Sequence, residues 1–246
     1  MRIYRLLTGC LLIYLMSFDA RANIVLGGTR LIYPGGEREV TLPLSNKGAT
    51  PALVQSWMDD GATDSTPENS SAPFLIMPPL TRIEGQASQT LRILFNGTAL
   101  PPDRESLFWL NVLEVPPVPE KSRNKNNLLL AVQSRIKVFY RPATLRSSLH
   151  DAAKHLTWQV FGDGAQLKLR CTNTSPLHVS FADIQVKWAG KTLTNTDGNH
   201  MVAPGGEAVF ELHPQTARLP ELKAQGIQFN YINDYGALKT VNAQFD

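Results

Sequence analysis

The sequence of 246 residues contains only two cysteines, Cys10 and Cys171, so at most one internal disulfide is possible. After residue 22 its apolar segments are short, which excludes a membrane-spanning helix, and no long stretch holds a helical period. The charge is nearly balanced, with 24 basic and 21 acidic residues, so there is no broad electrostatic footprint for nucleic acid. A chain of this length can form one or two domains that are stabilised by packing alone.

Residues 1–22 have the features of a secretory signal. Two arginines precede an apolar run that is too short to span a bilayer, and Ala20-Arg21-Ala22 supplies small residues before a cut. We expect cleavage after Ala22, which removes three basic residues, one acidic residue and Cys10, and leaves a net charge of +1. Cys171 would then be unpaired. A lipoprotein-like pattern around Cys10 is the less favoured alternative, because most of the apolar run follows that cysteine.

Catalytic and metal-binding motifs are missing from the sequence. It has no G-x-S-x-G, H-E-x-x-H or P-loop pattern, and its five histidines are scattered without metal-ligand spacing. Asp59, Asp60 and Asp64 suggest calcium but lack the full ligand repeat, so we interpret them as part of a solvated hairpin loop. We therefore expect no enzyme activity, no metal site and no cofactor.

The rest of the chain alternates short segments rich in β-branched and aromatic residues with Gly, Pro, Asn and Asp, a pattern typical of β-sandwiches. Arg141-Pro142 follows the longest segment, and a residue before proline is biased towards extended geometry. We place a domain boundary there, which predicts an all-β protein with domains at 23–142 and 143–246. Short helices are predicted near 145–155 and 215–224. The predicted strands are 24–33, 38–45, 51–58, 88–95, 106–115, 128–140, 156–161, 165–172, 177–188, 207–212, 227–232 and 237–245.

The segment NNLLLAVQSRIKVFYRP, residues 126–142, places Lys137 inside an otherwise apolar strand. It follows residues 116–127, which combine prolines, mixed charge and polar residues and are predicted to be a flexible hairpin connection. Proteins usually protect an exposed edge strand against pairing with another chain, but the apolar start of this strand carries no such protection. The simplest interpretation is a buried strand with one solvated cation.

Five motifs, spread along the chain, resemble one protein family. LPPDRESLFWLNVLEVPP at 100–117 is similar to the signature of the periplasmic chaperones of the chaperone/usher pilus pathway. Further parts of the same family are resembled by GTRLIYPGGEREVTLPLSN at 28–46, PPLTRIEGQASQTLRIL at 78–94, RIKVFYRP at 135–142 and YINDYG at 231–236. The resemblance covers essentially the whole chain after residue 22. It implies two immunoglobulin-like domains arranged as a boomerang with a cleft between them.

The resemblance also implies a function and a location. Members of this family bind pilus subunits (pilins) in the periplasm by donating a strand to them, and deliver them to an outer-membrane usher. A pilin lacks its last strand, and its open groove would aggregate if left alone. By the residue match the donated strand is 128–140, with Leu128, Leu130 and Val132 as the inserted side chains. Alternation alone favours the alternative that these three residues face the protein's own core.

Arg30 and Lys137 match the cleft cations of the family. The resemblance implies that they bind the C-terminal carboxylate of the subunit and thereby set the register of the donated strand. Without the motifs, both residues would be interpreted as solvated surface charges. Lys137 lies an odd number of positions after Val132, so a regular strand would direct it to the opposite face. A bulge or a change in exposure near the cleft would reconcile the two assignments.

Glu105, Arg141 and Asp234 resemble an interdomain charge network of the family. One cation between two carboxylates across a hinge would hold the angle between the domains, and with it the shape of the cleft. Three unrelated surface charges are the alternative.

Pro51, Leu53 and Val115 fall where the family places an apolar usher-docking patch, although edge-strand packing would explain them equally well. A self-capping dimer that covers strand 128–140 is a further expectation for the free protein.

The sequence lacks a cysteine pair around the 116–127 loop, which resembles the short-loop branch of the family, associated with rod-like pili. Cys171 is expected to be a buried core residue. The alternative function is a secreted two-domain β-sandwich adhesin or carbohydrate-binding protein. Such a protein would present aromatic residues on a binding loop, whereas all four tryptophans lie within strand patterns and are interpreted as core.

Overall fold

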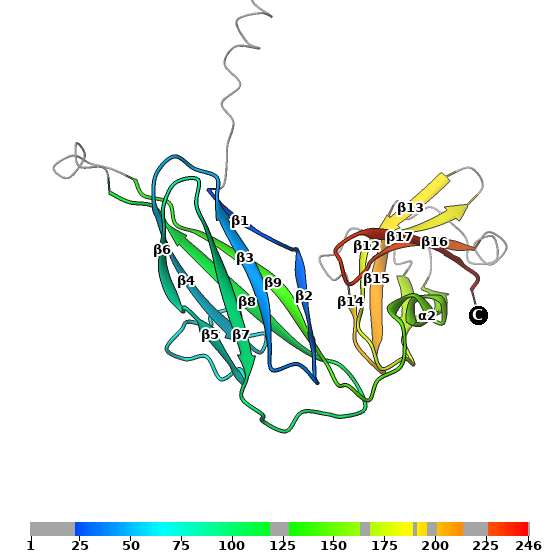
Figure 1. The fold of residues 1–246 in the computed structure, drawn as a ribbon. Helices are drawn as coiled ribbons and strands as arrows, with labels where there is room; N and C mark the ends of the chain where they lie inside the picture. Colours follow the sequence, from blue (N-terminus) through cyan, green and yellow to red (C-terminus); the bar gives the residue numbers. More distant parts are fainter. Residues whose placement is uncertain are drawn as a thin grey trace, which may run out of the picture.

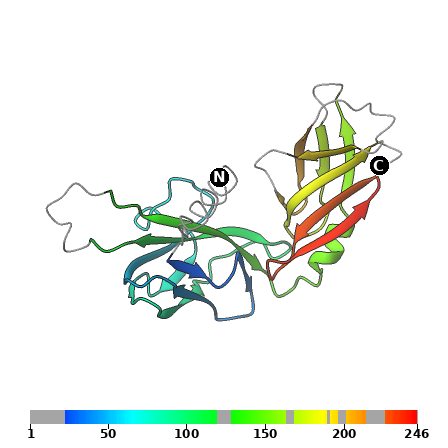
Figure 2. The same cartoon turned by 90° about the horizontal axis from the view of Figure 1, so that it is seen from above.

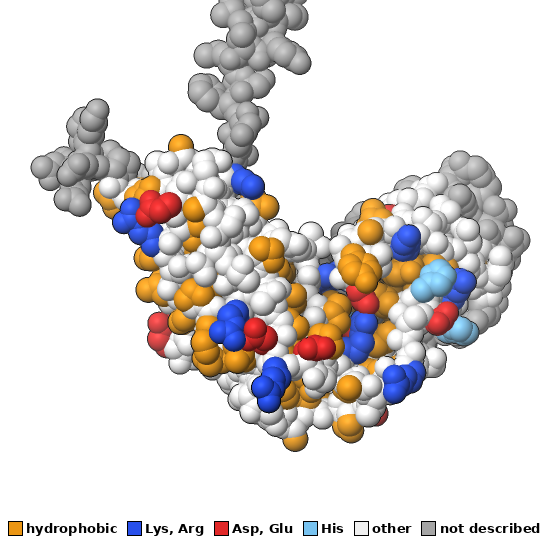
Figure 3. Space-filling model, viewed as in Figure 1, with side chains coloured by type: hydrophobic (Ala, Val, Ile, Leu, Met, Phe, Trp, Pro, Cys, Tyr) orange, Lys and Arg blue, Asp and Glu red, His pale blue; other side chains and the backbone are white. Residues whose placement is uncertain are grey.

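The computed structural model describes residues 23–118, 128–162, 168–188, 191–195, 201–213 and 226–245. The expected signal at 1–22, most of the 116–127 loop and the helix predicted near 215–224 lie outside these residues. The described chain forms two β-sandwich domains that meet at an angle (Figures 1 and 2). The space-filling view shows a hollow between them (Figure 3). The predicted all-β fold, with two immunoglobulin-like domains in a boomerang arrangement, is confirmed.

The N-terminal domain consists of two sheets packed face to face. One sheet has the strand order β1-β3-β7-β5 and the other the order β2-β9-β8-β4-β6. Neighbouring strands are antiparallel except β2 and β9, which are parallel. The strands are β1 (Ile24–Leu26), β2 (Arg30–Pro34), β3 (Glu39–Asn46), β4 (Ala52–Asp59), β5 (Phe74–Met77), β6 (Leu80–Ile83), β7 (Ser88–Phe95), β8 (Ser106–Val115) and β9 (Val132–Arg141).

Alternate residues of these strands fill the space between the two sheets. Leu44 and Ile93 from the four-stranded sheet belong to the same buried cluster as Val54, Leu110 and Val138 from the five-stranded sheet. Because successive side chains of a strand point to opposite faces, the remaining residues lie on the outer faces. The outer face of the five-stranded sheet carries the charged residues of the candidate site.

The C-terminal domain is a second sandwich made by one curled set of strands. Their order is β10-β11-β15-β13-β12-β16-β17, and the short β14 pairs with β12. Its core is aromatic: Trp158 lies 5.1–6.4 Å, between ring centroids, from Phe181, Phe210 and Phe229. The strands are β10 (Thr157–Phe161), β11 (Lys168–Thr172), β12 (Val179–Trp188), β13 (Lys191–Asn195), β14 (Met201–Val202), β15 (Glu207–His213), β16 (Ile227–Ile232) and β17 (Leu238–Ala243).

One short helix, α2 (Leu149–Lys154), precedes β10 and falls within the helix predicted near 145–155. The side chain of Ser148 caps it by accepting a hydrogen bond from the backbone N–H of Asp151, which satisfies one of the free donors at the helix start. Leu149 is buried in the core of the C-terminal domain. The N-terminal core cluster and its packed neighbours extend to Tyr140, and those of the C-terminal domain begin at Leu145.

The strand predicted at 24–33 is instead two strands in different sheets. β1 pairs with β3, whereas β2 pairs with β9. The chain changes sheet at Gly27, whose N–H donates to the carbonyl of Pro43 at 2.8 Å. A Cβ at Gly27 would lie 2.4 Å from Cγ of Pro43, so a side chain cannot be placed there without a shift.

The strand predicted at 128–140 starts later than expected, at Val132. Val132 is opposite Glu114 on β8, near the end of that strand at Val115. Pro116-Pro117 follows and offers no N–H to extend the ladder, so residues 128–131 are not paired. The sequence pattern also does not predict β5, β6, β13 and β14, which are two to five residues long.

Candidate functional site

The edge of β9 that faces away from β8 is unpaired over part of its length. β9 lies between β8 and β2, and β2 pairs with it only from Lys137 to Arg141. Among the strands that the structure describes, none pairs with residues 132–136 on the side away from β8. This stretch therefore presents unpaired backbone donors and acceptors to which another strand can add.

The three predicted donor residues lie at the start of this free edge and are exposed. The exposed fraction is 84% for Leu128, 68% for Leu130 and 46% for Val132. They are not part of the protein's own core in this structure, contrary to the alternative that alternation alone favours. Leu129 is 46% exposed as well, so the apolar segment has no buried side.

Arg30 and Lys137 lie side by side where the free edge ends, as register partners on the parallel strands β2 and β9. The Nη1 of Arg30 donates to the backbone carbonyl of Ile232 at 2.9 Å, which connects this cation to the C-terminal domain. The Nε of Arg30 is buried, and among the described residues it has no hydrogen-bond partner. Among the described carboxylates, none forms an ion pair with Lys137. This geometry leaves two cations available to an external anion.

The two cations carry perturbed pKa values. Burial, and then the neighbouring charge of Arg30, lower the pKa of Lys137 to about 8. Burial also lowers the pKa of Arg30, although the charges of Asp234 and Glu105 oppose this effect. A carboxylate bound between the two side chains would relieve their repulsion and satisfy the free donor of Arg30.

Lys137 and Val132 do point to opposite faces of β9. The pairing of β9 with β8 is continuous from Val132 to Tyr140, so there is no bulge between the two residues. Val132 has the parity of the core residues Ile136 and Val138, and Lys137 has the parity of the outer face. The expectation that a bulge brings Lys137 and Val132 to the same face of β9 is therefore wrong.

The three residues of the predicted charge network lie together at the junction of the domains. The Nε of Arg141 donates to Glu105 at 2.8 Å, and its two terminal nitrogens donate to Asp234 at 2.7 and 2.9 Å. Burial opposes the charge of Arg141, but the hydrogen bond to Asp234 and the charges of both carboxylates raise its pKa above the ordinary value. The arrangement connects β9 to the turn between β16 and β17, and thus one domain to the other.

His178 completes this network and was not singled out by sequence reasoning. Its backbone N–H donates to Glu105 at 2.8 Å, and its Nδ1 lies 3.2 Å from the same carboxylate oxygen. The backbone N–H of Glu105 in turn donates to the carbonyl of Pro176 at 2.9 Å. In the sequence, nothing distinguishes His178 from the four other histidines. Its contact with Glu105 spans 73 positions and forms only when the domains meet.

A second ion pair on the outer face of the five-stranded sheet was also missed. Asp59 is buried at the end of β4 and accepts two hydrogen bonds from Arg135, at 2.5 and 3.2 Å. Asn111 donates to it at 2.5 Å. Burial opposes its charge, but the hydrogen bonds from Arg135, Asn111 and Gly61 lower the pKa of Asp59. The interpretation of Asp59 as a solvated loop residue is therefore wrong, whereas Asp60 and Asp64 are exposed.

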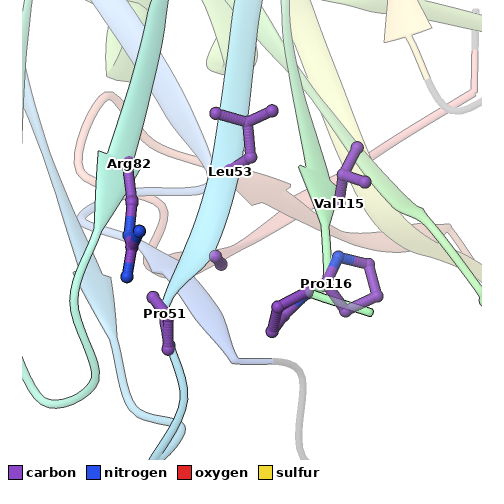
Figure 4. A pocket seen from close by; sticks show the side chains of 7 residues that line it. Pro51, Leu53, Arg82, Val115 and Pro116 are labelled. Carbon is purple, nitrogen blue, oxygen red and sulfur yellow. The ribbon is translucent and has the colours of Figure 1, made fainter. Parts of the chain in front are cut away.

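Pro51, Leu53 and Val115 line one pocket at the far end of the N-terminal domain (Figure 4). Leu53 and Val115 are directly opposite each other on β4 and β8, and both are exposed, by 43% and 37%. Arg82 and Pro116 border the same pocket. The patch is thus apolar with one cation at its rim.

The hollow between the domains is bordered on the C-terminal side by a mixture of hydrophobic, basic and acidic side chains (Figure 3).

Cys171 is fully buried in the C-terminal core, and burial raises the pKa of its thiol. Trp57 and Trp158 are buried as predicted, but Trp109 is only partly buried, on the outer face of the sheet. The side chain of Trp188 lies outside the described residues. No helix in the described ranges is long and apolar enough to cross a membrane.

Comparisons with known proteins agree over nearly the whole chain. The family described as pili and flagellar-assembly chaperone, PapD N-terminal domain, matches residues 23–146, and the pili assembly chaperone PapD, C-terminal domain, matches residues 151–243. The probable fimbrial chaperone YadV of Escherichia coli K12 is 38% identical over 231 residues, which cover 93% of this chain and 92% of the relative.

Two solved structures have the same fold. The CupB2 chaperone of Pseudomonas aeruginosa is similar with a TM-score of 0.75 and 36% identity, covering 90% of this chain and 100% of that chain. The SafB chaperone of Salmonella enterica, solved in complex with the SafA pilin, has a TM-score of 0.74 and 28% identity, covering 93% of this chain and 99% of that chain. The chain therefore belongs to the PapD family of pilus-assembly chaperones.

Proposed function

We propose that this protein binds newly exported pilus subunits in the periplasm by donor-strand complementation and delivers them to an outer-membrane usher. The observation that carries the proposal is the free edge of β9. An exposed apolar segment with Leu128, Leu130 and Val132 leads along this edge to two cations that lack a carboxylate partner among the described residues. The family, and the pilin bound to the SafB chaperone, support the same conclusion.

The free edge supplies the two kinds of contact that an incomplete sandwich needs. Backbone groups of residues 132–136 can pair with a strand of the subunit, which gives affinity without reading its sequence. Alternate apolar side chains can fill the open groove. At roughly 25 cal/mol per Å² of apolar area buried, three such side chains contribute a few kcal/mol before ordering costs.

Arg30 and Lys137 act as the anchor that sets the register of this pairing. A C-terminal carboxylate can accept hydrogen bonds from both cations at once, and every subunit offers one. Lys137 belongs to the same strand as the donated edge, so binding the carboxylate fixes how far along the edge the subunit lies. Loss of either cation from this partly desolvated site costs about 2–5 kcal/mol of binding free energy.

The Glu105–Arg141–Asp234 network holds the hinge between the domains and so keeps the anchor intact. Arg30 belongs to the N-terminal domain but donates to Ile232 in the C-terminal domain. A change of the interdomain angle would therefore remove the acceptor that orients the side chain of Arg30.

The apolar pocket around Leu53 and Val115 is the proposed usher-docking patch. It lies on the N-terminal domain, at the opposite end of β8 from the domain junction (Figures 1 and 4). Its lining residues come from β4, β6 and β8, whereas the free edge belongs to β9, so we assign the usher and the subunit to different strands of the sheet. Transfer needs no nucleotide or cofactor, because a better donor strand can replace the strand of the chaperone. A self-capping dimer of the free protein would protect the exposed leucines until a subunit arrives.

Co-purification from the periplasm tests the proposal. Tagged wild-type protein, Lys137→Ala and the control Lys154→Ala, which changes an exposed lysine on α2, are each co-expressed with candidate pilins. We expect a one-to-one soluble complex with wild type and the control, and a degraded or aggregated subunit with Lys137→Ala. Recovery of a cognate pilin with all three proteins in equal amounts would contradict the anchor.

A further inference from the structure

Trp109 lies at the centre of a row of charged side chains on the outer face of the five-stranded sheet. It is directly opposite Lys137 on β9 and directly opposite Asp59 on β4. The Nζ of Lys137 lies 5.5 Å from the centroid of the indole ring, and the Cζ of Arg135 lies 4.4 Å from it. A cation within about 6 Å of a ring face is attracted by its quadrupole. The indole is therefore placed to stabilise both cations.

The two cations differ in how much they depend on the ring. Arg135 is paired with the buried carboxylate of Asp59 through two hydrogen bonds. Lys137 has no ion-pair partner among the described carboxylates, and its register neighbour on β2 is a second cation, Arg30. The ring of Trp109 is thus the favourable electrostatic contact of Lys137 that the structure records.

We propose that Trp109 is a positioning residue for the subunit anchor: its indole holds the ammonium of Lys137, in the charged form, beside Arg30. The inference rests on the proposed function, since it is the bound carboxylate that makes a charged Lys137 useful. The ion pair of Arg135 with Asp59 serves the same end, because it neutralises the cation nearest to the ring.

A purely structural role for Trp109 makes the opposite prediction. If the indole only excludes water from Lys137, a smaller side chain at this position lets water in and raises the pKa of the lysine. If the ring attracts the ammonium, its removal destabilises the charged form and lowers the pKa further. The direction of the change therefore separates the two roles.

Other charges near Lys137 remain in place when Trp109 is replaced. Arg30 faces it from β2, Arg135 shares its strand, and Asp59 lies across Trp109 on β4. Glu105 and Asp234 act on Arg30, where their charges oppose the lowering of its pKa by burial, and both also bind Arg141. These contributions are common to wild type and variants, so a difference in titration reports on the ring.

The test is a pH titration of Lys137 by NMR in protein with ¹³C-labelled lysine, with the signal assigned from its absence in Lys137→Arg. Wild type is expected to titrate with a midpoint of about 8. For Trp109→Leu we expect a midpoint lower by roughly 0.5 pH units, and for Trp109→Phe, which keeps a weaker ring, a smaller decrease. A midpoint that is unchanged or higher in Trp109→Leu overturns the proposal. If that variant does not fold, Trp109→Phe decides in the same way.

Subunit capture is measured separately, so that failure of this inference and failure of the proposed function are distinguishable. In co-purification with a cognate pilin at pH 7.5, Trp109→Leu should retain up to about 3-fold less subunit than wild type, with partial recovery in Trp109→Phe. A lowered midpoint with undiminished capture, together with undiminished capture by Lys137→Ala, rejects the carboxylate anchor but leaves the role of the ring intact. A normal midpoint with capture lost only in Lys137→Ala rejects the role of Trp109 alone.

Discussion

Replacing Arg141 by Ala tests whether the charge network at the hinge holds the two domains together. The guanidinium makes one hydrogen bond to Glu105, whose side chain is almost completely buried, and two to Asp234, whose side chain is 29% exposed. A hydrogen bond to a buried charged group contributes about 1.5–3 kcal/mol. The more exposed pair contributes about 0–1 kcal/mol, because Asp234 can be hydrated again. We therefore expect Arg141→Ala to lower the free energy of unfolding by about 2–4 kcal/mol.

Arg92→Ala is the matched control, because Arg92 forms an ion pair with Glu39 in which both side chains are at least one-third exposed. Its loss should cost much less stability than the loss of Arg141, because water screens an exposed ion pair. The assay is urea unfolding followed by tryptophan fluorescence, with small-angle X-ray scattering of the folded proteins to detect a change in the interdomain angle. Equal losses in the two variants, with an unchanged scattering profile for Arg141→Ala, would refute the reasoning.

Two further predictions concern the usher patch and the anchor. Leu53→Asp places a charge in the apolar pocket opposite Val115. It should abolish usher binding in a pull-down and leave the pilin complex and the unfolding midpoint unchanged. Loss of the pilin complex in this variant would contradict the assignment of usher and subunit to separate surfaces. Because the pKa of Lys137 is lowered to about 8, its charge is present below this pH and is lost above it, so the affinity for a pilin should decrease as the pH rises from 7 to 9. In Lys137→Arg, which stays charged over this range, the decrease should be absent, and a decrease of the same size there would assign the effect to another group.

The fold was predictable where strands are long and alternate regularly. β8 spans the predicted 106–115, and β7 spans the predicted 88–95. Strands of two to five residues, such as β5 and β14, have too few residues to show a period of two, so their sequences do not distinguish them from loops. The break at Gly27 depends on a close approach to Pro43, a residue 16 positions away, and local sequence does not report such an approach.

The candidate site divides in the same way. Motif resemblance selected Arg30, Lys137, Glu105, Arg141 and Asp234, and the structure brings them together at the domain junction. It did not select His178, Asp59 or Trp109, whose contacts are made by strands or loops distant in sequence. The start of β9 at Val132 also depends on where its partner β8 ends.

The sequence alone determined the class of the protein, since alternating short apolar segments and the ordered motifs are local properties that need no knowledge of contacts. Only the tertiary structure decided which residues act on one another. Burial and neighbouring charge set the pKa of Lys137, and an exposed leucine segment differs from a core strand only by what packs against it. Both depend on the positions of side chains from distant strands, which folding fixes and a linear pattern does not contain.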